Sequence, residues 1–423
     1  MGPGTRRGAA VLSSLTLLAG SACSAPGEEN AVHLFFVPEP SIPAIVEQCN
    51  AMANGDYRIV FHELPRDGAG QLASVRKELG EAGGADIAGL DVTWTPEFAE
   101  RGRLAEWTGA ELAEAERGVL EGPRSTARWA GKVRAATKNT NVQLLWFDDR
   151  LVPRPPSSWD ELIDQAARLR AGGKPGHLLV TGAEYEGLVV LYNSMVGSAG
   201  GRLLGEDGKS AVVDAGAVAA LGTLRALADT GALHPFVARH REEDIRLAFE
   251  RGEGAFQVNW PYVYPAMAQA RPVDLPHFRW ARVPGSVPGT GGRSTIGGYN
   301  LGVRAESARP EVFQAALCLR SPENQKLAAV RDGLPPTLEQ VYADTTPLDP
   351  ARPVDPVTNP SMATAYPMKD TIAEAVREAA PRPATPAYQE VSATIARVLS
   401  PPGAIDPERT AATLRTELGG VLG

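Results

Sequence analysis

The side chains best suited to chemistry in this sequence are polar groups near aromatic rings or at the predicted ends of strands. Carboxylates and amides hydrogen-bond to hydroxyl groups, a guanidinium adds fixed donors, and an aromatic face packs on the C–H side of a sugar ring. This mixture is typical of a site for a small polyhydroxylated ligand. Capping of a helix or turn is the alternative role for the two carboxylates. The candidates are Asp91, Asn141, Glu186, Asn259, Trp260 and Arg382.

The segment 255–265 contains a short apolar strand, Ala255–Val258, followed by an aromatic cluster. Two prolines inside the cluster argue against a continuous strand, so we expect a rigid loop just past the strand end. Such a loop can present rings to a cleft, and core packing is the alternative for each ring. We assign Trp260 as a platform for the ligand, and Tyr262 and Tyr264 as packing for the next segment.

Several kinds of reactive site are absent from the sequence. The 6 histidines form no pair spaced three or four residues apart, so we expect no metal site. No Gly-x-Ser-x-Gly motif occurs, and Gly208-Lys209-Ser210 lacks the first glycine of a phosphate-binding loop. We therefore expect neither a cofactor nor an enzyme. The alternative from another class is a secreted glycoside hydrolase in which Asp91 and Glu186 act as acid and base.

The N-terminus has the pattern of an export signal rather than of a folded element. Two arginines precede a largely apolar run, Ala9–Ala22, which is too short to cross a bilayer as a helix. The run ends in Gly20-Ser21-Ala22-Cys23, which resembles a lipobox, although Gly20 stands where Leu is usual. We predict a signal peptide at residues 1–22 and an extracytoplasmic protein anchored to the cell membrane through lipid on Cys23. An ordinary secreted protein is the alternative.

The two remaining cysteines, Cys49 and Cys318, make an even pair in an exported chain. Such a pair indicates a disulfide that closes a long loop. Two separate buried thiols remain the alternative. The net charge of −8, with acids spread along the chain, excludes the basic footprint of a nucleic-acid-binding protein.

Elements that position these residues alternate between strands and helices in the first part of the chain. The order predicts an α/β layer with largely parallel strands, whose ligands lie beyond the carboxyl ends of the strands. Asp91 falls at such an end. The predicted strands are Val32–Val37, Arg58–Leu64 and Asp86–Leu90, and the helices between them are Ile42–Met52 and Gln71–Leu79.

A length of 423 residues predicts two lobes, and Ala135–Phe147 is expected as a strand that crosses between them. The second lobe repeats the alternation, with Asp214 as the cap of a long amphipathic helix. Residues 333–359 are proline-rich and are expected to form a loop. Helices are expected at Trp159–Leu169, Gly187–Val196, Asp244–Arg251, Glu311–Leu319, Thr371–Glu378, Tyr388–Leu399 and Glu408–Leu418.

Four segments, taken in order, resemble the group-1 family of extracellular solute-binding proteins of carbohydrate ABC importers. The resemblance covers essentially the whole mature chain. The segments are Asn141-Val142-Gln143-Leu144-Leu145-Trp146-Phe147, Trp159-Asp160-Glu161-Leu162, Phe249-x-x-Gly252-x-x-Ala255-Phe256 leading to Trp260, and Gly297-Gly298-Tyr299-Asn300-Leu301.

Within that family the chain is most similar to members that bind trehalose. This resemblance implies hydrogen bonds to the sugar from Asp91, Asn141, Glu186 and Arg382, stacking on Trp260, and a cleft bordered by Gly298 and Tyr299. Three departures bear on which sugar is bound. The loop Pro38-Glu39-Pro40-Ser41 is shortened, Phe147 stands where Tyr is common, and Tyr299 replaces a smaller aliphatic residue.

The resemblance implies an α/β fold of the two-lobed, periplasmic-binding-protein-like type II, with a multi-strand hinge. Residues 23–137 and 298–345 would form lobe I, and residues 138–297 and 346–423 lobe II. We expect a monomer that does not bind nucleic acid. It would capture a disaccharide, most narrowly trehalose, and deliver it to the permease subunits of an ABC transporter. Maltose, another glycan or a polyol is the alternative ligand.

Overall fold

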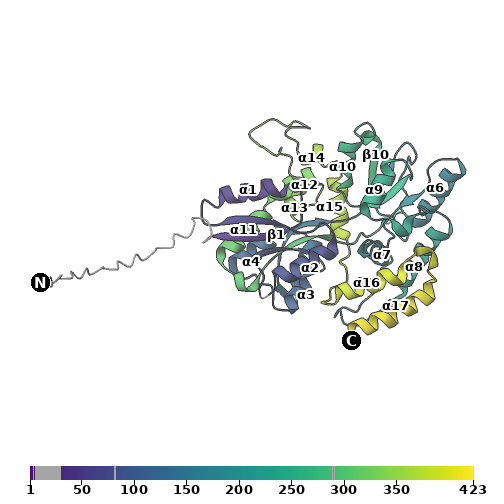
Figure 1. Cartoon of the computed structure of the whole chain (residues 1–423). Helices are drawn as coiled ribbons and strands as arrows, with labels where there is room; N and C mark the ends of the chain where they lie inside the picture. Colours follow the sequence, from purple (N-terminus) through teal and green to yellow (C-terminus); the bar gives the residue numbers. More distant parts are fainter. Residues whose placement is uncertain (3, 5–29, 81, 288, 290) are drawn as a thin grey trace.

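The structure is a computed structural model that describes residues 1, 2, 4, 30–80, 82–287, 289 and 291–423. It has two α/β lobes, each built around its own sheet, which confirms the predicted fold class (Figure 1). The predicted signal peptide and the lipid site at Cys23 lie outside the described residues. Among the described residues, no helix combines the length and apolar character needed to cross a membrane.

The first lobe contains a five-stranded mixed sheet. Its strands β1, β2 and β3 are parallel, but β11 runs antiparallel to both β3 and β6. The expectation of largely parallel strands, made for the first part of the chain, is confirmed for these three strands. The sheet as a whole is mixed because β6 leaves for the second lobe and β11 returns from it. In spatial order the strands are β2 (Arg58–Glu63), β1 (Ala31–Phe36), β3 (Ile87–Asp91), β11 (Gly297–Val303) and β6 (Ala136–Asn141).

Helices cover the sheet of the first lobe because one side of each is apolar. In α1 the buried residues Ile42, Ile45 and Cys49 recur at helical spacing, and this face packs in the apolar core beside β1. The helices of this lobe are α1 (Ile42–Met52), α2 (Gly68–Glu78), α3 (Thr95–Glu100), α4 (Gly109–Glu116), α5 (Glu121–Thr126), α11 (Pro310–Leu319) and α12 (Pro322–Asp332), with a hairpin of β4 (Arg128–Trp129) and β5 (Lys132–Val133).

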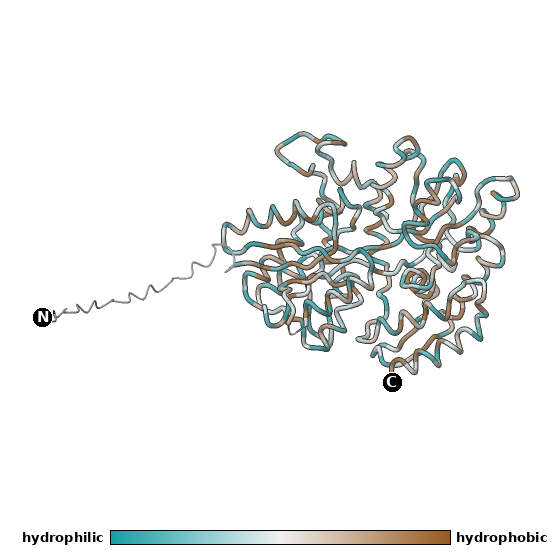
Figure 2. Tube along the Cα trace, in the orientation of Figure 1, coloured by the Kyte–Doolittle hydropathy of each residue, from teal (hydrophilic) through white to brown (hydrophobic). Residues whose placement is uncertain are grey.

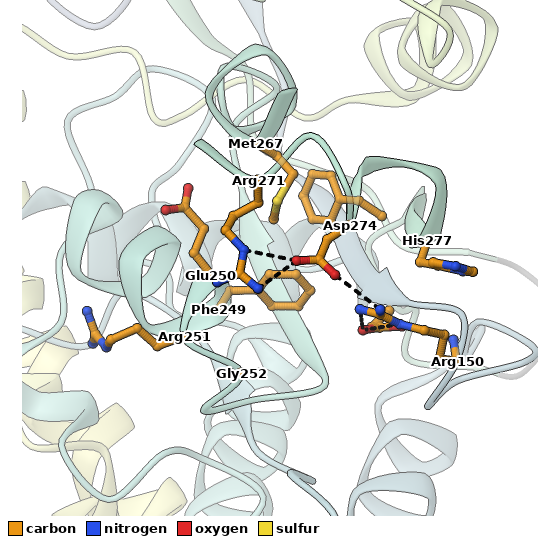
Figure 3. Close-up of a pocket in the computed structure, with 11 residues that line it drawn as sticks. Arg150, Phe249, Glu250, Arg251, Gly252, Met267, Arg271, Asp274 and His277 are labelled. Atoms are coloured by element: carbon orange, nitrogen blue, oxygen red, sulfur yellow. Dashed lines mark hydrogen bonds and ion pairs between the residues drawn. The ribbon is translucent and has the colours of Figure 1, made fainter. Parts of the chain in front are cut away.

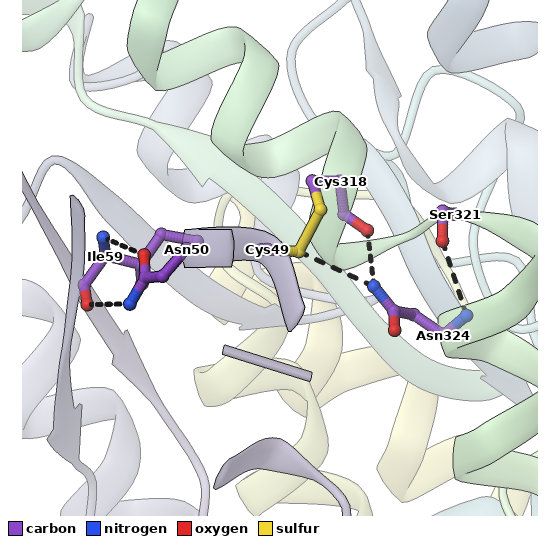
Figure 4. The surroundings of a disulfide bond; sticks show 6 residues. All are labelled: Cys49, Asn50, Ile59, Cys318, Ser321 and Asn324. Carbon is purple, nitrogen blue, oxygen red and sulfur yellow. Dashed lines mark hydrogen bonds between the residues drawn. A yellow bond between two sulfur atoms is a disulfide. The ribbon is translucent and has the colours of Figure 1, made fainter. Parts of the chain in front are cut away.

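A disulfide joins α1 to α11 inside the first lobe, as predicted. The sulfur atoms of Cys49 and Cys318 are 2.10 Å apart, and 269 residues separate the two cysteines in the sequence. Asn324 Nδ2 donates to the Cys318 carbonyl at 2.8 Å and lies 3.5 Å from Cys49 Sγ (Figure 4). At the end of α1, Asn50 exchanges two hydrogen bonds with the backbone of Ile59, which ties the helix to β2.

The second lobe has a four-stranded sheet in the order β10 (Phe278–Arg282), β7 (Leu144–Asp148), β9 (Phe256–Asn259) and β8 (Leu178–Leu179). Helix α7 is buried on nearly all sides, which matches its continuous apolar sequence. Asp214 accepts a hydrogen bond from Ala217 N and caps α8, as predicted. The helices that surround this sheet are α6 (Trp159–Ala171), α7 (Glu186–Ser198), α8 (Ala215–Asp229), α9 (Glu242–Glu250), α16 (Tyr388–Leu399) and α17 (Pro407–Leu422).

Three segments connect the lobes. Strand β6 leads to β7 through only Val142 and Gln143, so the crossing predicted in Ala135–Phe147 is two strands in two sheets. Strand β10 leads to β11, and the third segment follows α15 (Lys369–Glu378). Ala380 in that segment pairs with the second crossing, because its N–H donates to Ser294 O and its carbonyl accepts from Ile296 N, each at 3.0 Å. The precise lobe boundaries given above remain a prediction.

Two sequence expectations about loops are wrong. Helix α10 (Val263–Ala270) begins inside the aromatic segment, and Pro265 is compatible with it because the first helical turn needs no internal N–H bonds. Helix α13 (Glu339–Ala343) forms within the proline-rich stretch because Val341 and Tyr342 are buried against the core between the lobes. The tube in Figure 2 shows hydrophobic segments running through the interior of both lobes, with hydrophilic turns at the periphery.

Candidate functional site

Three charged side chains from distant parts of the chain meet between the lobes. Arg382 Nη1 donates to Glu186 Oε1 at 2.6 Å, and Arg382 Nη2 donates to Asp91 Oδ1 at 3.1 Å. Asp91 ends a strand of the first sheet, whereas Glu186 begins a helix of the second lobe. One guanidinium on the third connecting segment therefore links the two lobes. We call these three residues the charged cluster.

Local structure explains how each carboxylate is held. The backbone N–H and hydroxyl of Thr93 both donate to Asp91 Oδ1, at 2.9 and 2.7 Å, which fixes the carboxylate at the end of β3. Glu186 lies in the first turn of α7, where the positive end of the helix dipole favours a negative charge. The capping role considered from the sequence is therefore present at Asp91, whereas the hydrogen bonds of Glu186 go to other side chains and do not cap α7.

Two further residues contact Glu186 and were not predicted. Tyr388 donates its hydroxyl proton to Glu186 Oε1 at 2.7 Å, and the Ser392 hydroxyl donates to Glu186 Oε2. Both residues belong to α16, four positions apart, so they lie on one face of that helix. This spacing was available in the sequence, but nothing there indicated that α16 packs beside the start of α7.

The Arg382 side chain is 4% exposed, and its Nε atom is buried without a hydrogen-bond partner among the described residues. Burial by itself lowers the pKa of an arginine. Here the charges of Asp91 and Glu186 outweigh that effect and raise the pKa of Arg382 above its ordinary value. The guanidinium therefore stays charged.

Trp260 and Asn141 both lie close to Gly297, at the start of β11. A Cβ atom built on Gly297 would be 3.0 Å from the Trp260 ring and 3.3 Å from Asn141 Cβ. Trp260 is half-buried, and its backbone N–H donates to the side chain of the buried Asn259 at 2.9 Å. Asn259 thus positions the segment that carries the ring, while Tyr262 and Tyr264 pack on the apolar core, as predicted.

Gly298 and Tyr299 are the next two residues of β11. They connect Trp260 and Asn141 to the charged cluster. Gly298 has φ +114°, and a Cβ there would lie 2.4 Å from Asn139 O, so only glycine fits this close approach of backbone. Tyr299 is paired with Asp91 across the sheet and donates its hydroxyl proton to Gln71 at 2.9 Å. Burial and the charges of Asp91 and Glu39 raise the pKa of the Tyr299 hydroxyl. Strand pairing and contacts therefore link the seven predicted binding residues to one another, with Glu186 joined through Arg382, and their role in binding remains a prediction.

The shortened loop after Val37 contributes an ion pair that the sequence did not indicate. Glu39 accepts from Lys138 Nζ of β6, and both side chains are almost fully buried. The Lys138 ammonium also lies 4.9 Å from the centre of the Phe36 ring, which in turn contacts Tyr299 edge-on. Burial raises the pKa of Glu39 despite its partner. Through Phe36, this ion pair adjoins Tyr299 on the side of the first lobe.

A separate hollow on the second lobe has a volume of about 150 Å³ and contains none of the predicted site residues. Its apolar lining is bordered by Arg271 and Arg150, which both pair with Asp274 (Figure 3). The arginines at the rim of this hollow are therefore paired with a carboxylate of the same rim. Among the described residues, no group of three or more His, Cys, Asp or Glu has an arrangement that would hold a metal ion.

Comparisons with known proteins agree with this arrangement. A family model described as bacterial extracellular solute-binding protein matches residues 38–326. A relative from Deinococcus radiodurans, named "Probable ABC transporter-binding protein", is 26% identical over 341 residues, covering 76% of this chain and 80% of the relative.

Solved structures share the two-lobed fold. Maltose-bound MalE3 of T. maritima has a TM-score of 0.73 at 25% identity, covering 92% of this chain and 98% of its own. The GacH receptor of Streptomyces glaucescens has a TM-score of 0.73 at 21% identity, covering 93% and 98%. This family comprises binding components of transport systems and not enzymes, which sets aside the glycoside hydrolase alternative. Since the family model matches more than half of its length, the chain belongs to the bacterial extracellular solute-binding proteins.

Proposed function

We propose that this chain is the sugar-binding component of an ABC importer, and that it captures a disaccharide between its lobes and hands it to the permease. The observation that carries the proposal is the charged cluster, in which Arg382 bridges Asp91 of one lobe and Glu186 of the other. A ligand that hydrogen-bonds to these groups contacts both lobes at once. Binding therefore favours a closed arrangement, which is the form a permease can recognise.

Trehalose is the ligand we propose first. Trp260 offers an apolar face beside Gly297, and Asn141, Asp91, Glu186 and Arg382 offer acceptors and donors around it. Two linked pyranose rings provide both the C–H surface and the many hydroxyl groups that such a site needs.

We further propose that lipid on Cys23 anchors the protein at the outer face of the membrane. Loss of membrane association in the Cys23→Ser variant tests this proposal.

Maltose is the second candidate, because the similar T. maritima structure contains it. Other proteins of the same fold contain tagatose or ribitol, so a monosaccharide or polyol belongs in the comparison. Isothermal titration of the purified mature protein with trehalose, maltose, tagatose and ribitol tests the proposal. We expect micromolar or tighter binding of trehalose and weaker binding of the others. A clear signal for maltose beside none for trehalose rejects the narrower assignment, and no binding of any sugar rejects the function.

A further inference from the structure

We infer that the cleft also selects its ligand by charge: it accepts uncharged sugars and excludes acidic ones. This inference rests on the proposed function and adds a substrate class to it. It starts from the formal charges of the charged cluster, in which Asp91 and Glu186 contribute −2 and Arg382 contributes +1. The resulting −1 lies where the ligand would be enclosed.

Hydrogen bonding within the cluster leaves mainly acceptors open toward a ligand. Asp91 Oδ2 has only a long contact of 3.4 Å to Arg382 Nη2, whereas Oδ1 already accepts three shorter bonds. A sugar hydroxyl can donate to this free carboxylate oxygen. A carboxylate or phosphate has no proton to donate there, and it would place a second negative charge against the first.

The positive charges beside the site are already committed. Arg382 donates from each terminal nitrogen to one carboxylate, its side chain is only 4% exposed, and Lys138 is paired with Glu39. An anion that paired with the terminal nitrogens would have to compete with the carboxylate partner that each one already holds, or release it. Releasing it would leave a carboxylate unpaired in a partly buried position, which is costly.

The surroundings on the first lobe do not compensate for the net negative charge of the charged cluster. Glu39 and Lys138 cancel, while Asp332 accepts from the Ser41 hydroxyl and backbone at the same loop and adds negative charge. Burial is the largest cause of the raised pKa of the Tyr299 hydroxyl, and the charges of Asp91 and Glu39 raise this pKa further. Specificity of this kind arises from repulsion of the wrong ligand as much as from attraction of the right one.

A pair of ligands that differ only in charge tests the inference. One glucose unit of trehalose is oxidised at C6 to the uronic acid, and the comparison compound is the corresponding uronamide, which has nearly the same shape. We expect calorimetry on the wild-type protein to show the uronamide binding at least tenfold more tightly than the acid. If maltose is the better sugar in the ligand panel, the maltose-derived pair is used in the same way.

Variants then locate the source of the repulsion. Glu186→Gln removes one negative charge from the cluster, so the acid–amide ratio should shrink several-fold even if both ligands bind less tightly. Glu206→Gln makes the same charge change at an exposed position, 88% accessible, and should leave the ratio unchanged. The wild-type ratio should also persist at high salt, because salt screens exposed charges more than enclosed ones.

Each contrary outcome has a distinct meaning. Binding of the acid within about threefold of the amide, a ratio that vanishes in high salt, or an equal ratio in Glu186→Gln overturns the charge selection and leaves the sugar-binding function standing. Failure of trehalose, maltose and the amides alike overturns the proposed function, and the charge selection with it.

Discussion

At the scale of single residues, the polar groups of the site hydrogen-bond to one another and still leave specific atoms without a strong hydrogen bond. Arg382 is nearly inaccessible yet keeps an unpaired Nε–H, and Asp91 keeps one lightly used oxygen. Buried polar atoms without partners are uncommon and call for an explanation. A sugar hydroxyl that donates to the lightly used Asp91 oxygen would satisfy that atom.

Trp260 provides the clearest test of the platform. We expect Trp260→Ala to weaken sugar binding by about 2 kcal/mol or more, which is roughly thirtyfold, because a large apolar contact face is lost. Titration calorimetry measures the change. Trp129→Ala is the matched control, since that indole lies on the β4–β5 hairpin and donates to Glu100, and it should leave sugar affinity unchanged. Equal affinities for Trp260→Ala and wild type would remove Trp260 from the site.

At the scale of elements, the start of β11 is the structural centre of the site. Its residues pair with β3 on one side and β6 on the other, and they carry Gly297, Gly298 and Tyr299 past Trp260 and Asp91. The close approach of backbone at Gly298 brings these strands together at the crossing between lobes. A side chain there would separate the elements that bear the binding residues.

Gly298→Ala tests this role of β11. The added Cβ would lie 2.4 Å from Asn139 O at a backbone angle unfavourable for L residues, so we expect a loss of about 1–3 kcal/mol in the free energy of unfolding together with weaker sugar binding. Denaturant unfolding and calorimetry measure the two effects. Gly222→Ala in α8 has open space around its Cβ and should be neutral or slightly stabilising. A Gly298→Ala protein as stable as wild type would show that the backbone there shifts freely.

At the scale of the whole molecule, two lobes are joined by three segments, and the candidate site lies where those segments meet. Each lobe has its own apolar core, and a further apolar cluster contains residues of both lobes. Relative motion of such lobes is the usual expectation for a binding protein that encloses its ligand. The disulfide lies within the first lobe, between α1 and α11, so it constrains that lobe without tying it to the other.

The double variant Cys49→Ser, Cys318→Ser separates stability from binding. We expect a lower melting temperature, corresponding to about 2–5 kcal/mol, because the cross-link closes a very long loop in the unfolded chain. Sugar affinity at a temperature well below melting should match wild type, since neither cysteine contacts the charged cluster or Trp260. Calorimetric unfolding and titration give the two quantities. A large loss of affinity in the folded variant would contradict the separation proposed here.

Much of this organisation was predictable from local sequence. The helices Ile42–Met52 and Tyr388–Leu399 have the predicted bounds, because their apolar residues recur at helical spacing and bury one face. Asp91 was placed correctly at a strand end by the apolar run before it. The short helices α10 and α13 were missed because burial against distant residues, and not local pattern, stabilises them.

The sequence by itself determined which residue types are available for a sugar, where the main strands and helices lie, and which two cysteines can pair. Only the tertiary structure decided that Arg382 joins Asp91 to Glu186 across 291 and 196 residues of sequence, and that Tyr388, Ser392, Glu39 and Lys138 belong to the same region. The physical reason is that periodicity records which face of an element is buried. It does not record which other element covers that face.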